Sequence, residues 1–272
     1  MAKRPRTDWP KDRLRYWRES WAIARRILTE LFRRKRSLIA WMIFPATILL
    51  LNGIITGGKQ NNFTSQEAFE IAAPATLVGA ALFFSCLGGG VATIVAEREQ
   101  QTLKRLFLSP LSGVSYFLGT FLAHSVIGIG QTLVIFTIAF FAGAEFPDAN
   151  WPIAILIILL SILAYVGLGF MLGTQFARRT EDVSAIIAAF GVPLMVLGGA
   201  FLPIEIFPES LLKIAKFNPI YHMTQALTQV LRTPEVALNN DGHFLFLTIF
   251  AVLMVGVGWL SYRQMLATER QL

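Results

Sequence analysis

The sequence predicts an all-α integral membrane protein with six transmembrane helices. Of its 272 residues, 54% are hydrophobic and 15% are charged, and the mean hydropathy is +0.56. Soluble domains carry about 25% charged residues, so this composition is typical of a chain that lies mostly in lipid. Crossing a bilayer takes about 20 apolar residues. Six segments meet that length, at approximately 38–57, 70–95, 114–142, 152–176, 183–201 and 243–262.

The positions of lysine and arginine predict the orientation. Residues 1–36 hold thirteen basic and four acidic side chains. Together with the 96–113 and 177–182 connections and the tail, this side of the membrane has twenty Lys and Arg, against four on the other side. The positive-inside rule therefore places both termini in the cytoplasm. We expect a multi-pass protein of the plasma (inner) membrane, with a basic arm (1–36), a membrane domain (37–262) and a short tail (263–272).

The basic arm contains an apolar stripe at helical spacing. Its members recur at steps of three and four: Leu14, Trp17, Trp21, Ala24, Leu28 and Leu31. Arg25 and other arginines occupy much of the remaining surface. This pattern predicts an amphipathic helix in the headgroup plane, with tryptophans at the interface and arginines on lipid phosphates. An ordinary basic flank would explain the charge but not the stripe, so we expect membrane lipids, and no nucleic acid, as its partners.

The spans lack the residues that membrane chemistry requires. No charged side chain falls clearly inside a span, whereas ion-driven transporters usually need one to bind the coupling ion. Three scattered histidines have no metal-ligand spacing. The stretch GIITGGKQ (53–60) resembles a phosphate-binding loop, but Gln60 stands where that motif needs Ser or Thr. We therefore expect no enzymatic activity, metal or cofactor on this chain.

Uncharged polar residues do occur in the spans. His124 and Gln131 share a face of the third span, and Asn52 lies near the end of the first. Such groups must turn toward protein or water, because in lipid they would remain unpaired. They could line a transport route or join helices by hydrogen bonds, and the residues alone leave both roles open, with helix joining favoured. Gly169-x-x-x-Gly173 is a spacing at which helices often approach closely.

The connection at 97–108 predicts a short amphipathic helix. Glu97 and Glu99 come first and Lys104 and Arg105 later, which suits the helix dipole. Leucine and phenylalanine side chains fall along one side, and a proline ends the segment. A solvated loop would not require that apolar side, so we expect another protein to dock there.

At these residues the chain resembles ABC-2 type permeases, the membrane subunits of ATP-driven exporters. The stretch VAEREQQTLKRLFLSPLSGVSYFLGT (95–120) is similar to their pattern Glu-Arg-Glu-x-Gly-Thr-Leu-x-x-Leu-x-x-(Ser/Thr)-Pro. The matching residues are Glu97, Arg98, Glu99, Thr102, Leu103, Leu106, Ser109 and Pro110. Gln101 departs from the pattern, since many members have glycine there. The stretch 198–232 is also similar to the family's segment after its fifth span.

The resemblance implies how the chain works. The 97–108 segment, with Arg105 and Phe107, would be a cytoplasmic coupling helix in the groove of an ABC ATPase subunit. Two ATPase copies would bind ATP and Mg²⁺, and a second permease copy, as a homodimer, would complete the pore. Short re-entrant helices would lie on the outer face after span five. The sparsely polar spans favour a hydrophobic or amphipathic substrate; the alternatives are glycan export and a scaffold or passive channel without an ATPase.

Overall fold

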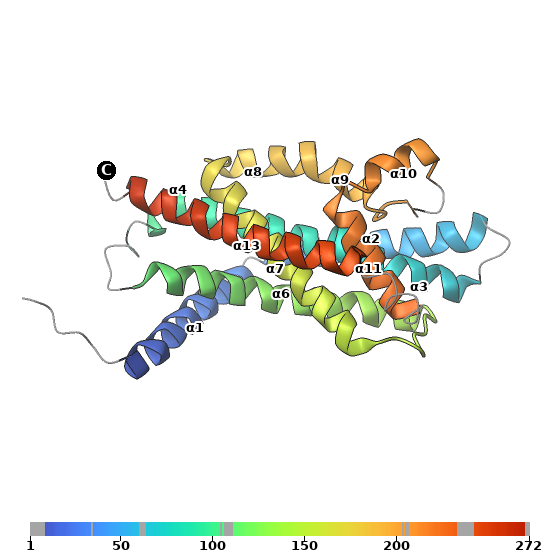
Figure 1. Ribbon diagram of the computed structural model, residues 1–272, viewed down its shortest axis with the longest axis horizontal. Coiled ribbons are helices and arrows are strands. Elements are labelled where there is room, and N and C mark those ends of the chain that lie inside the picture. The colour runs from blue at the N-terminus through green and yellow to red at the C-terminus, as the bar shows by residue number, and fades with distance from the viewer. Residues whose placement is uncertain are drawn as a thin grey trace, which may run out of the picture.

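The computed structural model describes residues 9–33, 35–59, 64–103, 105, 111–202, 204, 207–232 and 242–269. Within these ranges the chain is helical and contains no strand (Figure 1). The predicted all-α class and the six spans are confirmed, since six helices are long and apolar enough to cross a membrane. These are Leu38–Gly58, Ser65–Glu99, Gly113–Phe141, Trp151–Gln175, Thr180–Leu197 and Gly242–Ala267.

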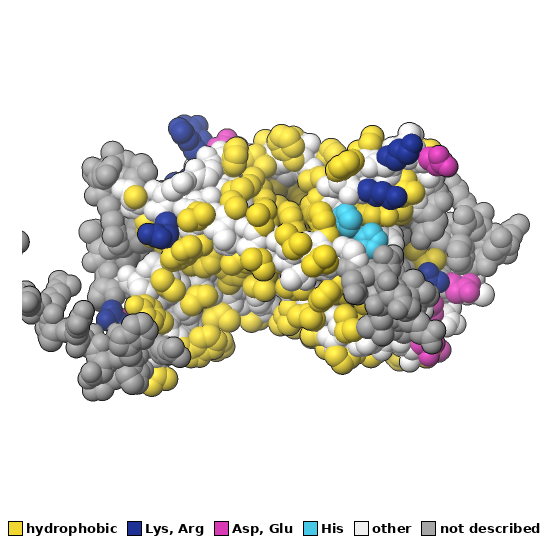
Figure 2. Space-filling view, viewed as in Figure 1, with side chains coloured by type: hydrophobic (Ala, Val, Ile, Leu, Met, Phe, Trp, Pro, Cys, Tyr) yellow, Lys and Arg dark blue, Asp and Glu magenta, His cyan; other side chains and the backbone are white. Residues whose placement is uncertain are grey.

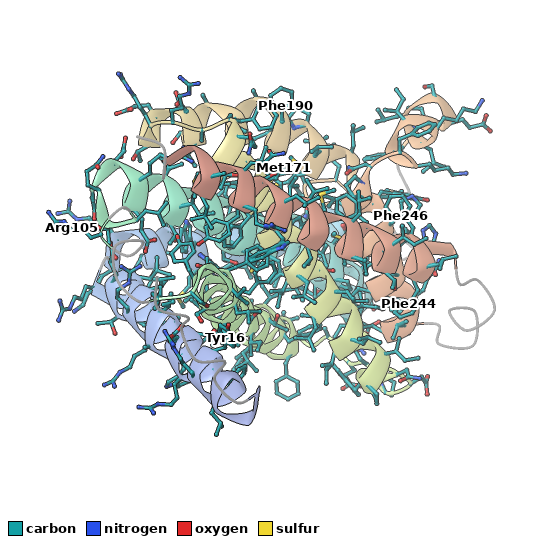
Figure 3. All side chains as sticks on the ribbon, turned by 60° about the vertical axis from the view of Figure 1, so that its left-hand side comes forward. Tyr16, Arg105, Met171, Phe190, Phe244 and Phe246 are labelled. Atoms are coloured by element: carbon teal, nitrogen blue, oxygen red, sulfur yellow. The ribbon has the colours of Figure 1, made fainter. Side chains whose placement is uncertain are left out.

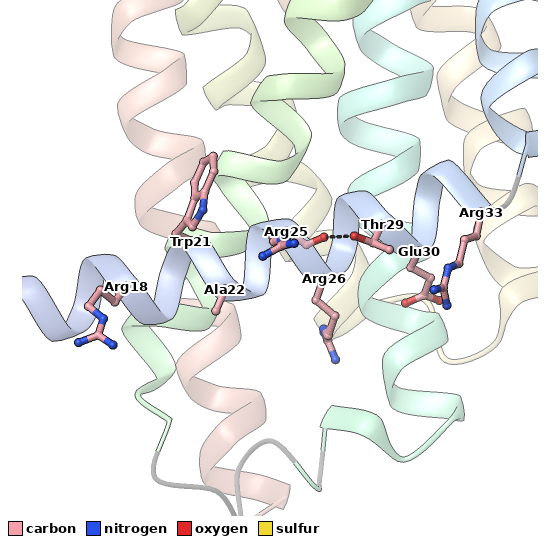
Figure 4. Close-up of a pocket in the computed structure, with 8 residues that line it drawn as sticks. All are labelled: Arg18, Trp21, Ala22, Arg25, Arg26, Thr29, Glu30 and Arg33. Atoms are coloured by element: carbon pink, nitrogen blue, oxygen red, sulfur yellow. Dashed lines mark hydrogen bonds between the residues drawn. The ribbon is translucent and has the colours of Figure 1, made fainter.

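The charged residues gather at the two ends of the bundle, and apolar side chains cover the surface between them (Figure 2). We call the end that carries α1 (Trp9–Arg33) the basic end and the opposite one the far end. At the basic end α1 runs across the ends of the spans rather than along them (Figure 4). The first span, α2 (Lys35–Lys59), follows it directly. Because α2 is helical through Lys59, residues 53–59 of the stretch resembling a phosphate-binding loop belong to a helix.

The second span forms the centre of the bundle. It consists of α3 (Ser65–Thr76), a π-helical segment η1 (Leu77–Gly88) and α4 (Gly89–Glu99). In its most apolar stretch 83% of the residues are buried, against 17–22% in spans one, five and six. It has no polar face in η1, as expected for a helix surrounded by others. A capping box between Thr64 and Glu67 fixes its start at the far end.

The third and fourth spans begin at side-chain caps. In α6 (Gly113–Phe141) the Ser112 hydroxyl accepts a hydrogen bond from the Ser115 backbone N–H at 3.0 Å. In α7 (Trp151–Gln175) the Asn150 side chain accepts one from Ile153. Such caps satisfy backbone N–H groups that a helix leaves free at its start. The first of them sets the register of α6 at the basic end, where the candidate site lies.

In the described part of its last third, the chain forms two spans and two short helices at the far end. The fifth span combines α8 (Thr180–Ile186), the π-helical η2 (Ile187–Gly191) and α9 (Val192–Leu197). The short helices are α10 (Glu209–Ala215) and α11 (Pro219–Arg232), and α13 (Gly242–Glu269) is the sixth span. Short helices after span five were expected from the resemblance; their re-entrant course stays a prediction.

Glycines allow the spans to approach closely. A Cβ atom on Gly258 of α13 would lie 2.5 Å from the carbonyl oxygen of Gly167 on α7, so only glycine fits there. The predicted pair Gly169 and Gly173 faces the central span instead. There a Cβ would lie 3.1 Å from the Leu87 carbonyl oxygen or 3.2 Å from Ile94. These contacts hold α7 between the central span and α13.

Candidate functional site

The candidate site lies at the basic end, where α4 finishes with Glu97, Arg98 and Glu99. Glu97 is buried, with 4% of its surface exposed. The Tyr116 hydroxyl of α6 donates to its Oε2 at 2.6 Å, and the Arg26 guanidinium of α1 forms an ion pair with its Oε1. A buried carboxylate needs such partners, because an unpaired charge away from water is costly. Glu97 therefore joins three helices.

Arg98 makes a second set of contacts in another direction. Its guanidinium donates to the carbonyl oxygens of Thr174 and Ala177, at 3.1 and 3.2 Å, where α7 ends. It also lies 2.8 Å from the Met265 sulfur of α13. The positive group thus satisfies carbonyls that the end of α7 leaves without a helical partner. Arg98 ties the central span to spans four and six.

Glu99 completes the series on the surface. Its carboxylate accepts hydrogen bonds from the Thr180 backbone N–H at 3.1 Å and from the Thr180 hydroxyl at 2.6 Å. Thr180 is the first residue of α8, where a negative charge is favourable. Three successive residues therefore connect the central span to α1, α6, α7, α8 and α13. We call this set of contacts, made by Glu97, Arg98 and Glu99, the charged joint.

The predicted helix over 97–108 is wrong at its start. The first three of these residues are the last turn of α4, which continues because their side chains find partners in the bundle. The chain then turns at Gln100 and at Gln101, whose φ of 55° lies in the left-handed region. Glycine adopts that region without strain. The departure from the family pattern at Gln101 thus falls at a position whose backbone favours glycine.

Beyond the turn the structure describes only part of the predicted docking segment. Thr102, Leu103 and Arg105 are helical. Leu103 is fully buried, and its place on a docking face stays a prediction, whereas Arg105 is exposed and points outward beside α1 (Figure 3). The other predicted docking residues lie outside the described ranges: Leu106, Phe107, Ser109 and Pro110. The docking role of Thr102 and Arg105 stays a prediction.

The apolar stripe of α1 divides between two environments. Ala24 and Leu31 pack on the bundle and Leu28 is half-buried, but Trp17 and Trp21 are exposed by 60% and 57%. The bundle-facing side is formed by Ser20, Ile23, Ala24, Ile27 and Leu31. It meets α6 at a glycine, Gly119, where a Cβ would lie 2.7 Å from Ile23. Residues 20, 23, 27 and 31 recur at steps of three and four, and this second stripe is the sequence pattern that indicates which side of α1 is buried.

The polar side of α1 forms an open groove of about 760 Å³, lined by arginines. In Figure 4 the Trp21 side chain lies on the opposite side of α1 from those of Arg18, Arg26 and Arg33. Arg25 is exposed next to this groove and accepts a hydrogen bond from Thr29 through its backbone carbonyl. Trp21 also lines this groove, so a tryptophan and several arginines share it, and the place of α1 in the membrane interface stays a prediction.

Glu19 anchors the first half of α1 to the start of α6. Its carboxylate accepts hydrogen bonds from the Arg15 guanidinium at 2.7 Å, from the Ser115 hydroxyl at 2.7 Å and from the Ser112 backbone N–H at 3.3 Å. Burial raises the pKa of Glu19, but the hydrogen bonds from Arg15, Ser115 and Ser112 outweigh it and hold the pKa below its usual value. Glu19 is therefore ionised at neutral pH.

The three predicted pathway residues are buried and bonded to neighbouring helices. His124 lies 3.2 Å from the Ser85 carbonyl oxygen and 3.3 Å from the Thr93 hydroxyl. Gln131 donates to the Trp41 carbonyl at 3.1 Å, and Asn52 to that of Ala200 at 2.7 Å. These contacts fit the role of joining helices, and a role in transport stays a prediction for all three.

Asn52 also lines a small cavity near the far end. Thr56 and Thr224 line it too, and both hydroxyls are buried without a hydrogen-bond partner in the described part of the chain. The cavity holds about 20 Å³, which is room for one water molecule. Elsewhere in the described ranges, no group of three or more His, Cys, Asp and Glu side chains is placed to hold a metal ion.

Comparison with known proteins agrees with this architecture. The chain is 25% identical to the putative transport permease YvfS of Bacillus subtilis, over 76% of this chain and 83% of that protein. It is 26% identical to the probable multidrug ABC transporter permease YbhR of Escherichia coli K12, over 51% of this chain but 37% of that one. The linearmycin resistance permease protein LnrN of B. subtilis is 26% identical, over 64% and 45%.

The family model described as ABC-2 type transporter matches residues 18–231. That range includes α1 from Arg18, five of the six spans, Glu97, Arg98 and Glu99 of the charged joint, and nearly all of the short helices of the far end. Six apolar helices make the chain a multi-pass membrane protein. It belongs to the ABC-2 type transporter family, whose members are membrane transport components that usually work with an ABC ATPase subunit.

Proposed function

We propose that this chain is the permease subunit of an ABC exporter that moves a hydrophobic or amphipathic substrate outward. ATP and Mg²⁺ are bound by two copies of a separate ATPase subunit, and this chain holds no cofactor. The observation that carries the proposal is the charged joint. It connects the end of span two, directly before the turn at Gln101, with spans three, four, five and six and with α1.

This arrangement suits the transmission of movement. A membrane domain without an energy source must receive work from its partner at the surface. Glu97, Arg98 and Glu99 lie directly before the turn at Gln101, so a displacement of the segment beyond the turn reaches every bonded helix. Packed helices that such contacts hold together move as rigid bodies and do not bend gradually. The arginine groove of α1 gives the ATPase a second, positively charged surface.

The distribution of lysine and arginine supports an orientation in the membrane, and the exposed faces of the spans support a dimer. In the sequence, the arm, the 96–113 and 177–182 connections and the tail hold twenty of the 24 Lys and Arg residues, which supports cytoplasmic termini and a far end that faces outward from the plasma membrane. Spans one and five bury only 22% and 17% of their most apolar stretches. Such faces are available to a second permease copy, which supports a homodimer with a pore between the two copies. The multidrug and linearmycin resistance relatives support an amphipathic substrate.

The test begins with affinity purification of the tagged chain from its native membrane. We expect an ABC ATPase subunit at equal stoichiometry. Arg105→Glu then reverses an exposed charge next to the turn, and we expect it to weaken that association and to lower ATP hydrolysis by the complex. The matched control is Arg263→Glu, which reverses another exposed charge at the basic end. A chain that purifies without any ATPase, in mild detergent and with ATP present, contradicts the proposal.

A further inference from the structure

A cavity of about 480 Å³ lies at the far end, where α6 ends and α7 begins. Its volume falls in the range of small-molecule sites, roughly 300–1,000 Å³. Phe136 and Phe140 line it from α6, Glu145 and Phe146 from the connection, and Trp151 from α7. None of these residues belongs to the charged joint or to the predicted pathway set. The cavity is therefore separate from every site considered above.

Three of the lining rings stand at large angles to one another. The centroids of Phe136 and Phe146 are 5.8 Å apart with planes at 82°, and those of Phe136 and Trp151 are 5.8 Å apart at 70°. Phe146 and Trp151 are 6.2 Å apart at 85°. Aromatic faces carry negative electrostatic potential and attract cations, with tryptophan the strongest. A guest in this cavity meets ring faces as well as ring edges.

The charge at the cavity is negative. The exposed Glu145 side chain lines it, and within the described ranges no hydrogen bond or ion pair engages that carboxylate. The Glu145 backbone N–H donates to Glu70 Oε1 at 3.2 Å, so a second carboxylate lies at the same connection. No described lysine or arginine lines the cavity. An anionic guest is disfavoured here, and a neutral one gains less from the carboxylate than a cation does.

We propose that this cavity binds a lipophilic organic cation, such as an aryl phosphonium or a quaternary ammonium with an apolar substituent. The rings bind the apolar groups and the positive centre, and Glu145 supplies the opposite charge. Aromatic residues also gather at membrane interfaces as belts. A belt explains the ring types but neither the cavity nor the carboxylate in its lining. The proposal concerns binding alone and does not depend on the exporter function.

The experiment measures binding of tetraphenylphosphonium and tetraphenylborate to the purified full chain in an uncharged maltoside detergent. The two ions have nearly the same size and opposite charge, so simple partition into micelles or apolar surface gives no preference for the cation. We expect saturable binding of tetraphenylphosphonium by equilibrium dialysis and none of tetraphenylborate. Equal binding of the two ions overturns the proposal.

Variants then locate the site. Glu145→Gln keeps the shape and removes the charge, and we expect tetraphenylphosphonium affinity to fall roughly tenfold. The matched control is Glu209→Gln, an exposed carboxylate of α10 at the same end, which should leave the affinity within about twofold. Trp151→Leu should weaken binding roughly fivefold. Glu145→Gln with the affinity of the unmodified chain excludes this cavity, and unchanged thermal unfolding of that variant shows that the fold is intact.

Discussion

The middle of the bundle and its basic end hold helices together in different ways. In the middle, α7 and α13 meet through Gly167 and Gly258, with backbone against backbone and no polar side chain between them. At the basic end the same two helices are joined through Arg98, which bonds the end of α7 and contacts Met265 of α13. Between these two helices, shape therefore fixes the contact in the middle of the bundle, and a charged side chain fixes it at the basic end.

The difference follows from the solvent at each level. Lipid tails are as apolar as leucine, so helices in the bilayer associate through close packing rather than through a hydrophobic driving force. A charge at that depth is costly. At the membrane surface ions are tolerated, and directional contacts such as those of Glu97 can set the angles between helices. Single substitutions that disturb one kind of contact at a time should therefore have separate and unequal effects on stability.

The largest effect is expected for Gly258→Ala in the middle. The added methyl group would lie 2.5 Å from the Gly167 carbonyl oxygen, and backbone atoms cannot move aside as a flexible side chain can. We expect the free energy of unfolding to fall by about 3 kcal/mol, as in overpacked cores. Gly256→Ala is the control, because a methyl group there meets nothing within 4 Å. Thermal unfolding in detergent measures both, and equal stability of the two variants would show that the helices can separate freely.

Glu97→Ala tests the charged joint itself. It leaves Arg26 without its ion-pair partner and the Tyr116 hydroxyl without its acceptor. Because the Arg26 side chain is about one-third exposed and can reach water, we expect a loss of about 2 kcal/mol, less than for a fully buried pair. The control Glu181→Ala removes an exposed carboxylate and should change stability by less than about 0.5 kcal/mol.

Tyr116→Phe removes one hydrogen bond from the same cluster and keeps the ring. The ring stacks on Tyr262 at a centroid distance of 5.4 Å, a contact that the substitution preserves. We expect a loss of about 1.5 kcal/mol, the usual size for a hydrogen bond to a charged group. Tyr16→Phe, at a residue 40% exposed on α1, is the comparison and should be neutral. Chemical denaturation of the two variants distinguishes these outcomes.

The smallest effect concerns pH and Glu19. Because its pKa is lowered in the folded protein, ionised Glu19 stabilises the fold above the pKa of the unfolded chain, about 4.3. This contribution is lost as pH falls through the folded pKa. We expect Glu19→Gln to be less stable than the unmodified chain by up to about 1 kcal/mol at pH 7, and the gap to shrink at pH 4. A gap that widens on acidification would reverse the assigned direction.

The fold was largely predictable, because six apolar segments without internal charge leave few alternatives to a six-span bundle. The position of the site in the sequence was predictable, but the contacts that its side chains make were not. The charges at 97–99 appeared to belong to a surface helix, since their partners lie far away in sequence: Arg26, Tyr116, Thr174, Thr180 and Met265. Nothing local distinguishes a carboxylate that faces a partner protein from one that faces an arginine 71 residues earlier.

The contact between Arg98 and Met265 also orders events during synthesis. The two residues are 167 positions apart, and Met265 lies on the last span. A chain that has inserted only five of these spans therefore contains Arg98 without one of its partners, and the joint is incomplete until α13 has inserted. The set of contacts around Arg98 thus forms only once the central span and α13 are both in place, so insertion of α13 precedes completion of the charged joint.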